Sequence, residues 1–248
     1  MVGITMQKRR SIRIVAALVA ALATSAITSS CDVAHPVRPR VLFVGDSYTG
    51  GAGVEDSQDA YPELIAQKAK WDLHLDAQGA TGFIEDGRGV ADNFDSSRLI
   101  DRLAADKQNF PKVDLLVVDA GRDDLTEQTL SKPVLAYHPA DEVANAILEY
   151  LTQGRRQWPD AKIVEIFPAF VSTSKPYDGY PELLAKVSAG LSAVGGTLVD
   201  PIAEGWYANI ETASIMDPDG LHPNRRGHAY IAVRLMESLR QSGVIPVA

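Results

Sequence analysis

Residues 40–47, Arg-Val-Leu-Phe-Val-Gly-Asp-Ser, join a hydrophobic run to an abrupt polar end. Four consecutive apolar residues, rich in β-branched and aromatic side chains, are typical of a strand inside a parallel sheet covered on both faces. Gly45 permits a sharp turn, so Ser47 stands at the carboxyl end of the strand, where open α/β sheets build their sites. The same tripeptide could be a solvated turn, and a functional Ser47 therefore needs support from elsewhere in the chain.

Strand and helix patterns alternate after this stretch. Hydrophobic spacing predicts one sheet with helices on both faces, an α/β fold with about five parallel strands, and no internal repeat. Asp141 is expected to cap the central helix. The further strands are expected at 71–75, 113–118, 163–170 and 197–199, and the helices at 61–70, around 99–103, and at 141–158, 181–194 and 224–241.

Two connections, 83–97 and 125–140, are longer than such units need. Long loops at the carboxyl edge of a sheet form either the walls of a site or excursions without a role in it. Phe83 and Tyr137 lie in these loops and could line a pocket, or each could pack against its own loop.

The first thirty residues have the pattern of a signal peptide. Four basic residues, Lys8, Arg9, Arg10 and Arg13, precede an alanine-rich apolar run over 14–27 that is too short to span a bilayer comfortably. The paired arginines lack the hydrophobic pair that a twin-arginine signal would have after them. We therefore expect a general secretory signal over residues 1–30, and an exported protein.

Cys31 is the only cysteine, so no intramolecular disulfide can form. It stands directly after Thr28-Ser29-Ser30, where a signal peptidase would cut, and this position resembles a bacterial lipobox with Thr28 in place of the usual Leu, Val or Ile. We expect Cys31 to be lipidated, with residues 31–39 as anchor and tether and 40–245 as the folded domain. Ordinary cleavage, leaving a secreted protein with a free thiol, is the alternative.

The charge of the chain argues against nucleic acid as a partner. The formal net charge is −8, and removal of residues 1–31 with their four basic groups changes it to −12. Phosphate binding needs a basic surface that this composition does not provide. Because no later stretch is apolar for long enough to span a bilayer, membrane contact is expected only through the lipid anchor.

A second chemical segment, Asp217-Pro-Asp219-Gly-Leu-His222-Pro-Asn224, precedes the last predicted helix. A turn can bring the Asp219 carboxylate to one nitrogen of His222, which fixes the tautomer so that the other nitrogen can face a nucleophile. An EF-hand calcium loop does not fit, because the third acid and the distal Glu are absent at the required offsets.

Four blocks in this order resemble those of the SGNH (GDSL-type) hydrolase family. They are Gly45-Asp46-Ser47, Gly79 after the second strand, the Gly121–Asp124 block, and Asp219-x-x-His222. The resemblance covers nearly all of residues 40–243. It implies a three-layer α/β/α, flavodoxin-like fold and an esterase that cleaves an acylated lipid or an O-acylated glycan.

The resemblance also implies roles for individual residues. Ser47 would be the nucleophile, His222 the base and Asp219 its partner, in a covalent acyl-enzyme mechanism. The oxyanion hole would use the N–H groups of Ser47 and Gly79 and the side chain of Asp123. His228 is expected to be structural.

Asp123 departs from the family pattern, which places Asn at this position. An ionised carboxylate has no donor and would repel the oxyanion. Either Asp123 stays protonated, or another donor such as Arg122 substitutes, or the protein is an impaired member that binds a glycan or lipid.

Other site motifs are incomplete. The glycines at 45–51 lack the Lys of a phosphate-binding loop, and 51–53 lacks the third glycine of a dinucleotide fingerprint. No His and Cys cluster has the spacing of metal ligands. We expect no cofactor and no metal, and the oligomeric state is left open.

Overall fold

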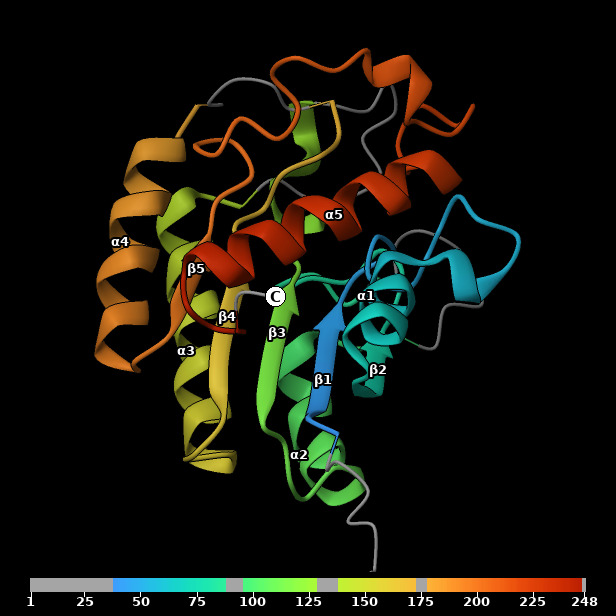
Figure 1. Cartoon of the computed structure of the whole chain (residues 1–248). Helices are drawn as coiled ribbons and strands as arrows, with labels where there is room; N and C mark the ends of the chain where they lie inside the picture. The colour runs from blue at the N-terminus through green and yellow to red at the C-terminus, as the bar shows by residue number, and fades with distance from the viewer. Residues whose placement is uncertain (1–37, 88–95, 129–137, 173–177, 247–248) are drawn as a thin grey trace, which may run out of the picture. The chain divides into compact units, whose positions relative to one another are not determined.

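The computed structural model describes residues 38–87, 96–128, 138–172 and 178–246. Five parallel strands form one sheet in the order β2-β1-β3-β4-β5 (Figure 1). This order is the flavodoxin-like arrangement, and the predicted α/β fold is confirmed. The strands are β1 (Arg40–Gly45), β2 (Asp72–Ala77), β3 (Leu115–Asp119), β4 (Lys162–Ile166) and β5 (Thr197–Val199).

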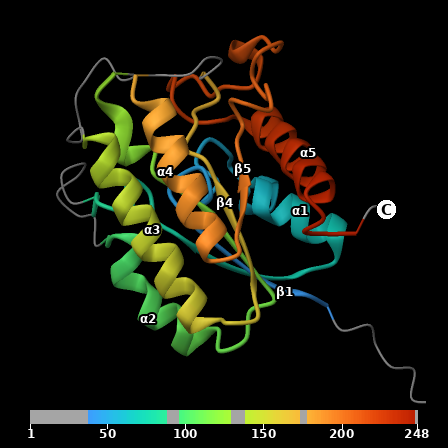
Figure 2. The same ribbon diagram turned by 90° about the vertical axis from the view of Figure 1, so that its left-hand side faces the viewer.

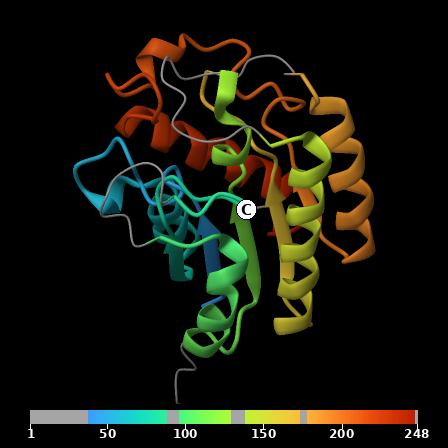
Figure 3. The ribbon, with the colours of Figure 1, turned by 180° about the vertical axis from the view of Figure 1, so that it is seen from behind.

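The helices form a layer on each side of the sheet. Seen from the side, α1 and α5 cover one face, and α2, α3 and α4 cover the other (Figure 2). The view from behind shows the second group, with α2 beside α3 (Figure 3). Their bounds are α1 (Tyr61–Ala69), α2 (Leu99–Asn109), α3 (Ala140–Gln157), α4 (Tyr180–Ala193) and α5 (Arg225–Gln241).

Alternating residues of β1 face the two layers. Val41 and Phe43 belong to the core shared with α1 and α5, whereas Leu42 and Val44 belong to the core shared with α2, α3 and α4. All four are fully buried. Both faces of this central strand therefore need apolar side chains, which explains its uninterrupted hydrophobic run.

Two boundaries differ from those expected. β4 ends at Ile166 instead of continuing to residue 170, because Pro168 has no N–H for the ladder. Asp141 is not the cap of α3: Pro139 holds that position and makes no side-chain cap hydrogen bond. Asp141 instead lies in the first turn, where its charge favours the helix dipole, and pairs with Lys186.

Phe83 is a core residue and not a pocket wall. Its ring is buried and meets Tyr150 of α3 edge to face, with 5.9 Å between ring centroids. Tyr137, Cys31 and the predicted signal peptide lie outside the described residues. In the part of the chain that the structure describes, no helix has the length and hydropathy of a membrane span.

Candidate active site

The turn that carries Ser47 packs tightly against the end of β3. A Cβ atom at position 45 would lie 2.2 Å from Oγ1 of Thr49 and 2.3 Å from the carbonyl oxygen of Asp119. Gly45 is therefore required by close approach rather than by an unusual dihedral angle. The chain turns at once, and Ser47 is left partly exposed at the carboxyl edge of the sheet.

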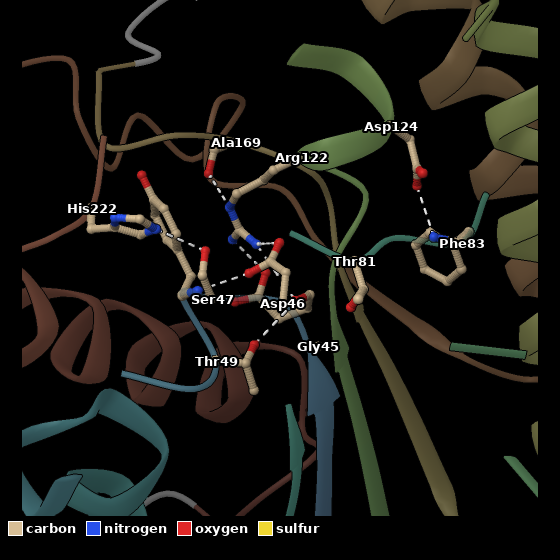
Figure 4. A network of polar contacts seen from close by, with 12 residues as sticks. Gly45, Asp46, Ser47, Thr49, Thr81, Phe83, Arg122, Asp124, Ala169 and His222 are labelled. Atoms are coloured by element: carbon tan, nitrogen blue, oxygen red, sulfur yellow. Dashed lines mark hydrogen bonds and ion pairs between the residues drawn. The ribbon is translucent and has the colours of Figure 1, made fainter. Parts of the chain in front are cut away.

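Ser47, His222 and Asp219 form a continuous chain of hydrogen bonds. Nε2 of His222 lies 2.9 Å from Oγ of Ser47 (Figure 4). Nδ1 of the same ring lies 2.6 Å from Oδ2 of Asp219. The structure thus brings together a nucleophile candidate and a base that are 175 positions apart.

The Asp219 carboxylate is held in its ionised form by the turn around it. Burial opposes that form, but hydrogen bonds from the His222 ring and from the backbone N–H groups of His222 and Leu221 outweigh burial and lower the pKa of Asp219. The two N–H groups lie 2.9 and 2.8 Å from Oδ1. An ionised Asp219 requires the proton of His222 on Nδ1, which leaves Nε2 free to accept the hydroxyl proton of Ser47.

Arg122 lies buried behind the nucleophile, with 5% of its side chain exposed. Its Nη1 donates to Asp46 Oδ2 at 2.9 Å, and its Nε donates to the Ala169 carbonyl oxygen at 2.8 Å (Figure 4). Its Nη2 pairs with Asp119. Each guanidinium nitrogen thus donates to a buried protein acceptor. This arrangement favours a structural role and argues against Arg122 as the substitute oxyanion donor.

Gly79 lies in the turn beside that of Ser47. The register pairs Gly45 with Ala77, and the N–H of Gln78 donates to the Gly45 carbonyl oxygen at 3.1 Å. Ser47 and Gly79 each lie two residues beyond this pair, after β1 and after β2. They therefore occupy neighbouring turns at the same edge of the sheet. This placement suits a pair of N–H donors around one substrate oxygen.

The loop after Gly79 is fixed by Asp124. Its carboxylate accepts the backbone N–H groups of Phe83, Ile84 and Glu85 at 2.8, 3.1 and 2.9 Å. A Cβ at Gly82 would lie 2.3 Å from the same carboxylate. Asp124 thereby holds the loop that carries Gly79 beside the site.

Asp123 opens the short helix η2 (Asp123–Gln128). Burial, followed by the negative charges of Asp46 and Asp124, raises the pKa of Asp123 well above its ordinary value, although Arg122 opposes this. A neutral carboxylic acid can donate a hydrogen bond. Of the possibilities left open by the sequence, a protonated Asp123 is the one that these surroundings favour.

The remaining histidine of interest, His228, is buried and structural. Its Nδ1 accepts the N–H of Tyr61 at 3.3 Å, and its Nε2 lies 3.0 Å from the carbonyl oxygen of Ala52. Burial lowers its pKa. Among the described residues, no group of three or more His, Cys, Asp or Glu side chains is arranged to hold a metal ion.

The chain matches a known family over most of its length. The model of the GDSL-like Lipase/Acylhydrolase family matches residues 43–230. The GDSL lipase Rv0518 of Mycobacterium tuberculosis is 26% identical over 203 residues, which cover 79% of each chain.

Solved structures share the fold at low sequence identity. An active-site mutant of a family two carbohydrate esterase from Clostridium thermocellum has a TM-score of 0.62 at 15% identity, covering 84% of this chain and 64% of that one. The salicylyl-acyltransferase SsfX3 of a tetracycline biosynthetic pathway has 0.59 at 20%, covering 86% and 57%. The esterase EstA of Pseudoalteromonas sp. has 0.59 at 12%, covering 83% and 99%.

The chain thus spans less than two thirds of the length of the Clostridium esterase and of SsfX3, and nearly all of EstA. At these identities the structures establish the fold alone, whereas the family match rests on the sequence itself. The chain belongs to the GDSL-like Lipase/Acylhydrolase family and is a hydrolase.

Proposed function

We propose that this protein cleaves carboxylic esters by a covalent acyl-enzyme mechanism with Ser47, His222 and Asp219 as its triad. The observation that supports this proposal most directly is the hydrogen-bonded chain from Ser47 Oγ through His222 to Asp219, with distances of 2.9 and 2.6 Å. Nucleophile, base and orienting carboxylate are the three parts that such a mechanism needs.

In the first half-reaction, Ser47 Oγ attacks the ester carbonyl carbon while its proton passes to Nε2 of His222. The ionised Asp219 stabilises the imidazolium that forms. The carbonyl oxygen becomes an oxyanion, which the N–H groups of Ser47 and Gly79 and the neutral acid of Asp123 would stabilise. Collapse of this intermediate expels the alcohol, protonated by His222, and leaves an acyl-Ser47.

In the second half-reaction, water replaces the alcohol. His222 takes a proton from the water as its oxygen attacks the acyl carbon, and the resulting intermediate expels Ser47 Oγ, which recovers its proton from His222. The products are a carboxylic acid and the free enzyme.

For the substrate, we propose an acylated lipid or an O-acylated glycan. The relative from Mycobacterium is named a lipase, and the similar structure from Clostridium is that of a carbohydrate esterase. A series of p-nitrophenyl esters of increasing chain length, beside an O-acetylated oligosaccharide, separates the two: a lipase prefers the longer acyl chains, and a glycan esterase releases acetate from the sugar.

A second candidate function rests only on the identity of residue 123, an acid where the family pattern has Asn. If the acid at this position ionises, the protein would bind an acylated glycan or lipid without turning it over at a useful rate. Binding of the oligosaccharide without acetate release would support this candidate.

We also propose that the protein is exported and lipid-anchored through Cys31. The support comes from the sequence: a basic and then apolar stretch over residues 1–30, directly followed by the only cysteine of the chain.

The triad is tested by Ser47→Ala and His222→Ala, each of which should abolish ester hydrolysis, because nucleophile and base act as one unit. Ser214→Ala, which removes a hydroxyl bonded to the Glu211 carbonyl oxygen, is the matched control and should keep wild-type activity. Circular dichroism checks that each variant is folded. Ser47→Ala with most of the wild-type rate would overturn the assignment.

A further inference from the structure

Arg102, in the second turn of α2, reaches the carboxyl edge of the sheet. Its side chain is 7% exposed. Nη2 donates to the carbonyl oxygen of Gly45 at 3.3 Å, and Nη1 donates to Thr81 Oγ1 at 3.3 Å and to the Ser97 carbonyl oxygen at 3.1 Å. One guanidinium therefore connects the last residue of β1, which leads into Ser47, with the loop that carries Gly79.

The loop itself depends on such an external support. Ala80, next to Gly79, has a φ of 58°, a left-handed conformation that costs free energy for a residue with a Cβ. Thr81 Oγ1 donates to the Gln78 carbonyl oxygen at 2.7 Å and accepts from Arg102. The hydroxyl of Thr81 thus connects Arg102 to Gln78, and Thr81 is also bonded directly to Ala80. Gln78 and Ala80 are the two residues that flank Gly79.

The charge of Arg102 faces two carboxyl groups. Asp76, at the end of β2, accepts Nε of Arg102 at 2.8 Å. Asp106, one turn along α2, is 4% exposed, and among the described residues its buried Oδ2 has no hydrogen-bond partner. With Asp106 protonated, the charges of Arg102 and Asp76 balance, whereas an ionised Asp106 gives the buried cluster a net negative charge.

The surroundings of Asp106 set the pH at which it loses its proton. Burial, followed by the negative charge of Asp76, raises the pKa of Asp106 from 3.8 to about 7, against the opposing charge of Arg102. From the neighbouring helix, Tyr150 of α3 also interacts electrostatically with Asp76, Arg102 and Asp106, and burial raises its pKa well above the usual range. Asp106 is therefore the group of this cluster that titrates near neutrality.

We propose that Arg102 is a positioning residue, which holds the Gly79 loop against the Ser47 turn, and that its hold depends on the protonation of the buried Asp106 one turn along the same helix. This inference rests on the proposed function, because it treats the Gly79 loop as part of the oxyanion hole. When Asp106 loses its proton, its carboxylate attracts the guanidinium and competes with the contacts of Arg102 to Gly45 and Thr81. The turnover number then falls as pH rises through about 7.

The first test compares Arg102→Lys with Arg98→Lys, using the best p-nitrophenyl ester. Lysine keeps the charge beside Asp76 but offers one nitrogen in place of three, so it cannot reach Asp76, Gly45 and Thr81 together. We expect kcat to fall about tenfold or more and KM to change by less than about threefold, because the loop is displaced while the substrate pocket remains. Arg98, the exposed residue directly before the same helix, is paired with Asp101 and should tolerate the change without effect.

Thr81→Val serves as a second, milder variant, because it removes the hydroxyl that Arg102 contacts and keeps the volume. It should lower kcat in the same way. An unchanged kcat in folded Arg102→Lys and in Thr81→Val would overturn the positioning role.

The second test compares Asp106→Asn with Asp101→Asn. The amide is permanently neutral, so Asp106→Asn should keep its kcat where the wild type loses activity above about pH 7, and Asp101→Asn should follow the wild type. Stability gives an independent readout. A folded-state pKa above the unfolded value means that the wild type loses stability relative to Asp106→Asn as pH rises from 3.8 to about 7, after which the difference is constant.

Urea unfolding at several pH values measures this difference whether or not the protein is active. A constant difference across this pH range, or identical pH profiles of kcat, would overturn the role of Asp106. Failure of the proposed function looks different: a wild type that neither cleaves esters nor reacts with a fluorophosphonate would remove the catalytic part of this inference together with that function.

Discussion

The hydroxyl of Tyr48 donates a hydrogen bond of 2.7 Å to the carbonyl oxygen of Leu221. Tyr48 follows the proposed nucleophile directly, and Leu221 precedes the proposed base. The same hydroxyl accepts the N–H of Val171 at 3.3 Å, and the ring lies 4.3 Å from the guanidinium of Arg122. Tyr48 therefore links the turns of Ser47 and His222 to the buried polar cluster beneath them.

Tyr48→Phe should lower kcat about tenfold and leave KM nearly unchanged, because it releases the His222 turn without altering the partly exposed surface of the site. Tyr230→Phe is the matched control, since that hydroxyl donates to the carbonyl oxygen of Trp206, away from the triad. Steady-state kinetics of the two variants measures the effect. Equal kcat values would show that the bond from Tyr48 to Leu221 has no part in catalysis.

Asp123→Asn should match the wild type where Asp123 is protonated and exceed it at alkaline pH. The pKa of Asp123 is raised by burial and by its acidic neighbours, so the acid keeps its donor until the pH passes that raised pKa. Loss of one oxyanion donor costs on the order of 10²–10³ in turnover, which sets the size of the alkaline decline.

The comparison of Asp123→Asn is best made in the Asp106→Asn background, where the titration of Asp106 near pH 7 is absent. The measurement is kcat against pH. A variant that is slower than its parent at every pH would give Asp123 a positive role other than donation, and its place in the oxyanion hole would have to be abandoned.

Asp124→Asn should destabilise the protein by about 1–3 kcal/mol, because the amide nitrogen must face a backbone N–H that the carboxylate now accepts. Three such N–H groups converge on this buried side chain. Asp141→Asn, which alters an exposed ion pair with Lys186, should change the free energy of unfolding by less than about 1 kcal/mol. Urea denaturation decides, and similar values for both variants would contradict the structural role of Asp124.

The strand at 40–45 could be predicted because burial on both faces leaves a direct mark in the sequence, a continuous apolar run. The turn at Asp219–His222 was also accessible, since a local offset of three residues is enough to bring a carboxylate to a ring nitrogen. The alternation of strands and helices predicts a parallel sheet. The flavodoxin-like arrangement of its strands is what the resemblance to the SGNH family implies.

The residues that support the site could not be predicted in the same way. The sequence suggests Arg122 only as a possible oxyanion donor, and only the fold brings Asp46, 76 positions away, to its guanidinium. Tyr48 reads as one more core aromatic, because its partner Leu221 is 173 positions distant. The role of Phe83 is ambiguous for a similar reason. The sequence around it does not show that its ring meets Tyr150 of α3.

Cys31→Ser should move the protein from the membrane fraction to the soluble fraction when the full chain is expressed in a bacterial host that lipidates such cysteines. Stable anchoring takes more than one acyl chain. We propose that these chains are attached at Cys31, so membrane association should be lost when this cysteine is replaced. Fractionation with intact-mass analysis gives the answer. A wild-type mature mass without added lipid, or an unchanged membrane fraction in Cys31→Ser, would refute the anchor.

Covalent labelling of the intact protein by a fluorophosphonate tests most directly the claim that Ser47 is an activated nucleophile. His222 Nε2 lies 2.9 Å from Ser47 Oγ, and this contact should make Ser47 react while other serines do not. We predict a mass increase of one adduct per chain, located on Ser47 by peptide mapping, absent in Ser47→Ala and strongly slowed in His222→Ala. No adduct on the folded wild type, or an adduct that persists in Ser47→Ala, would contradict the account.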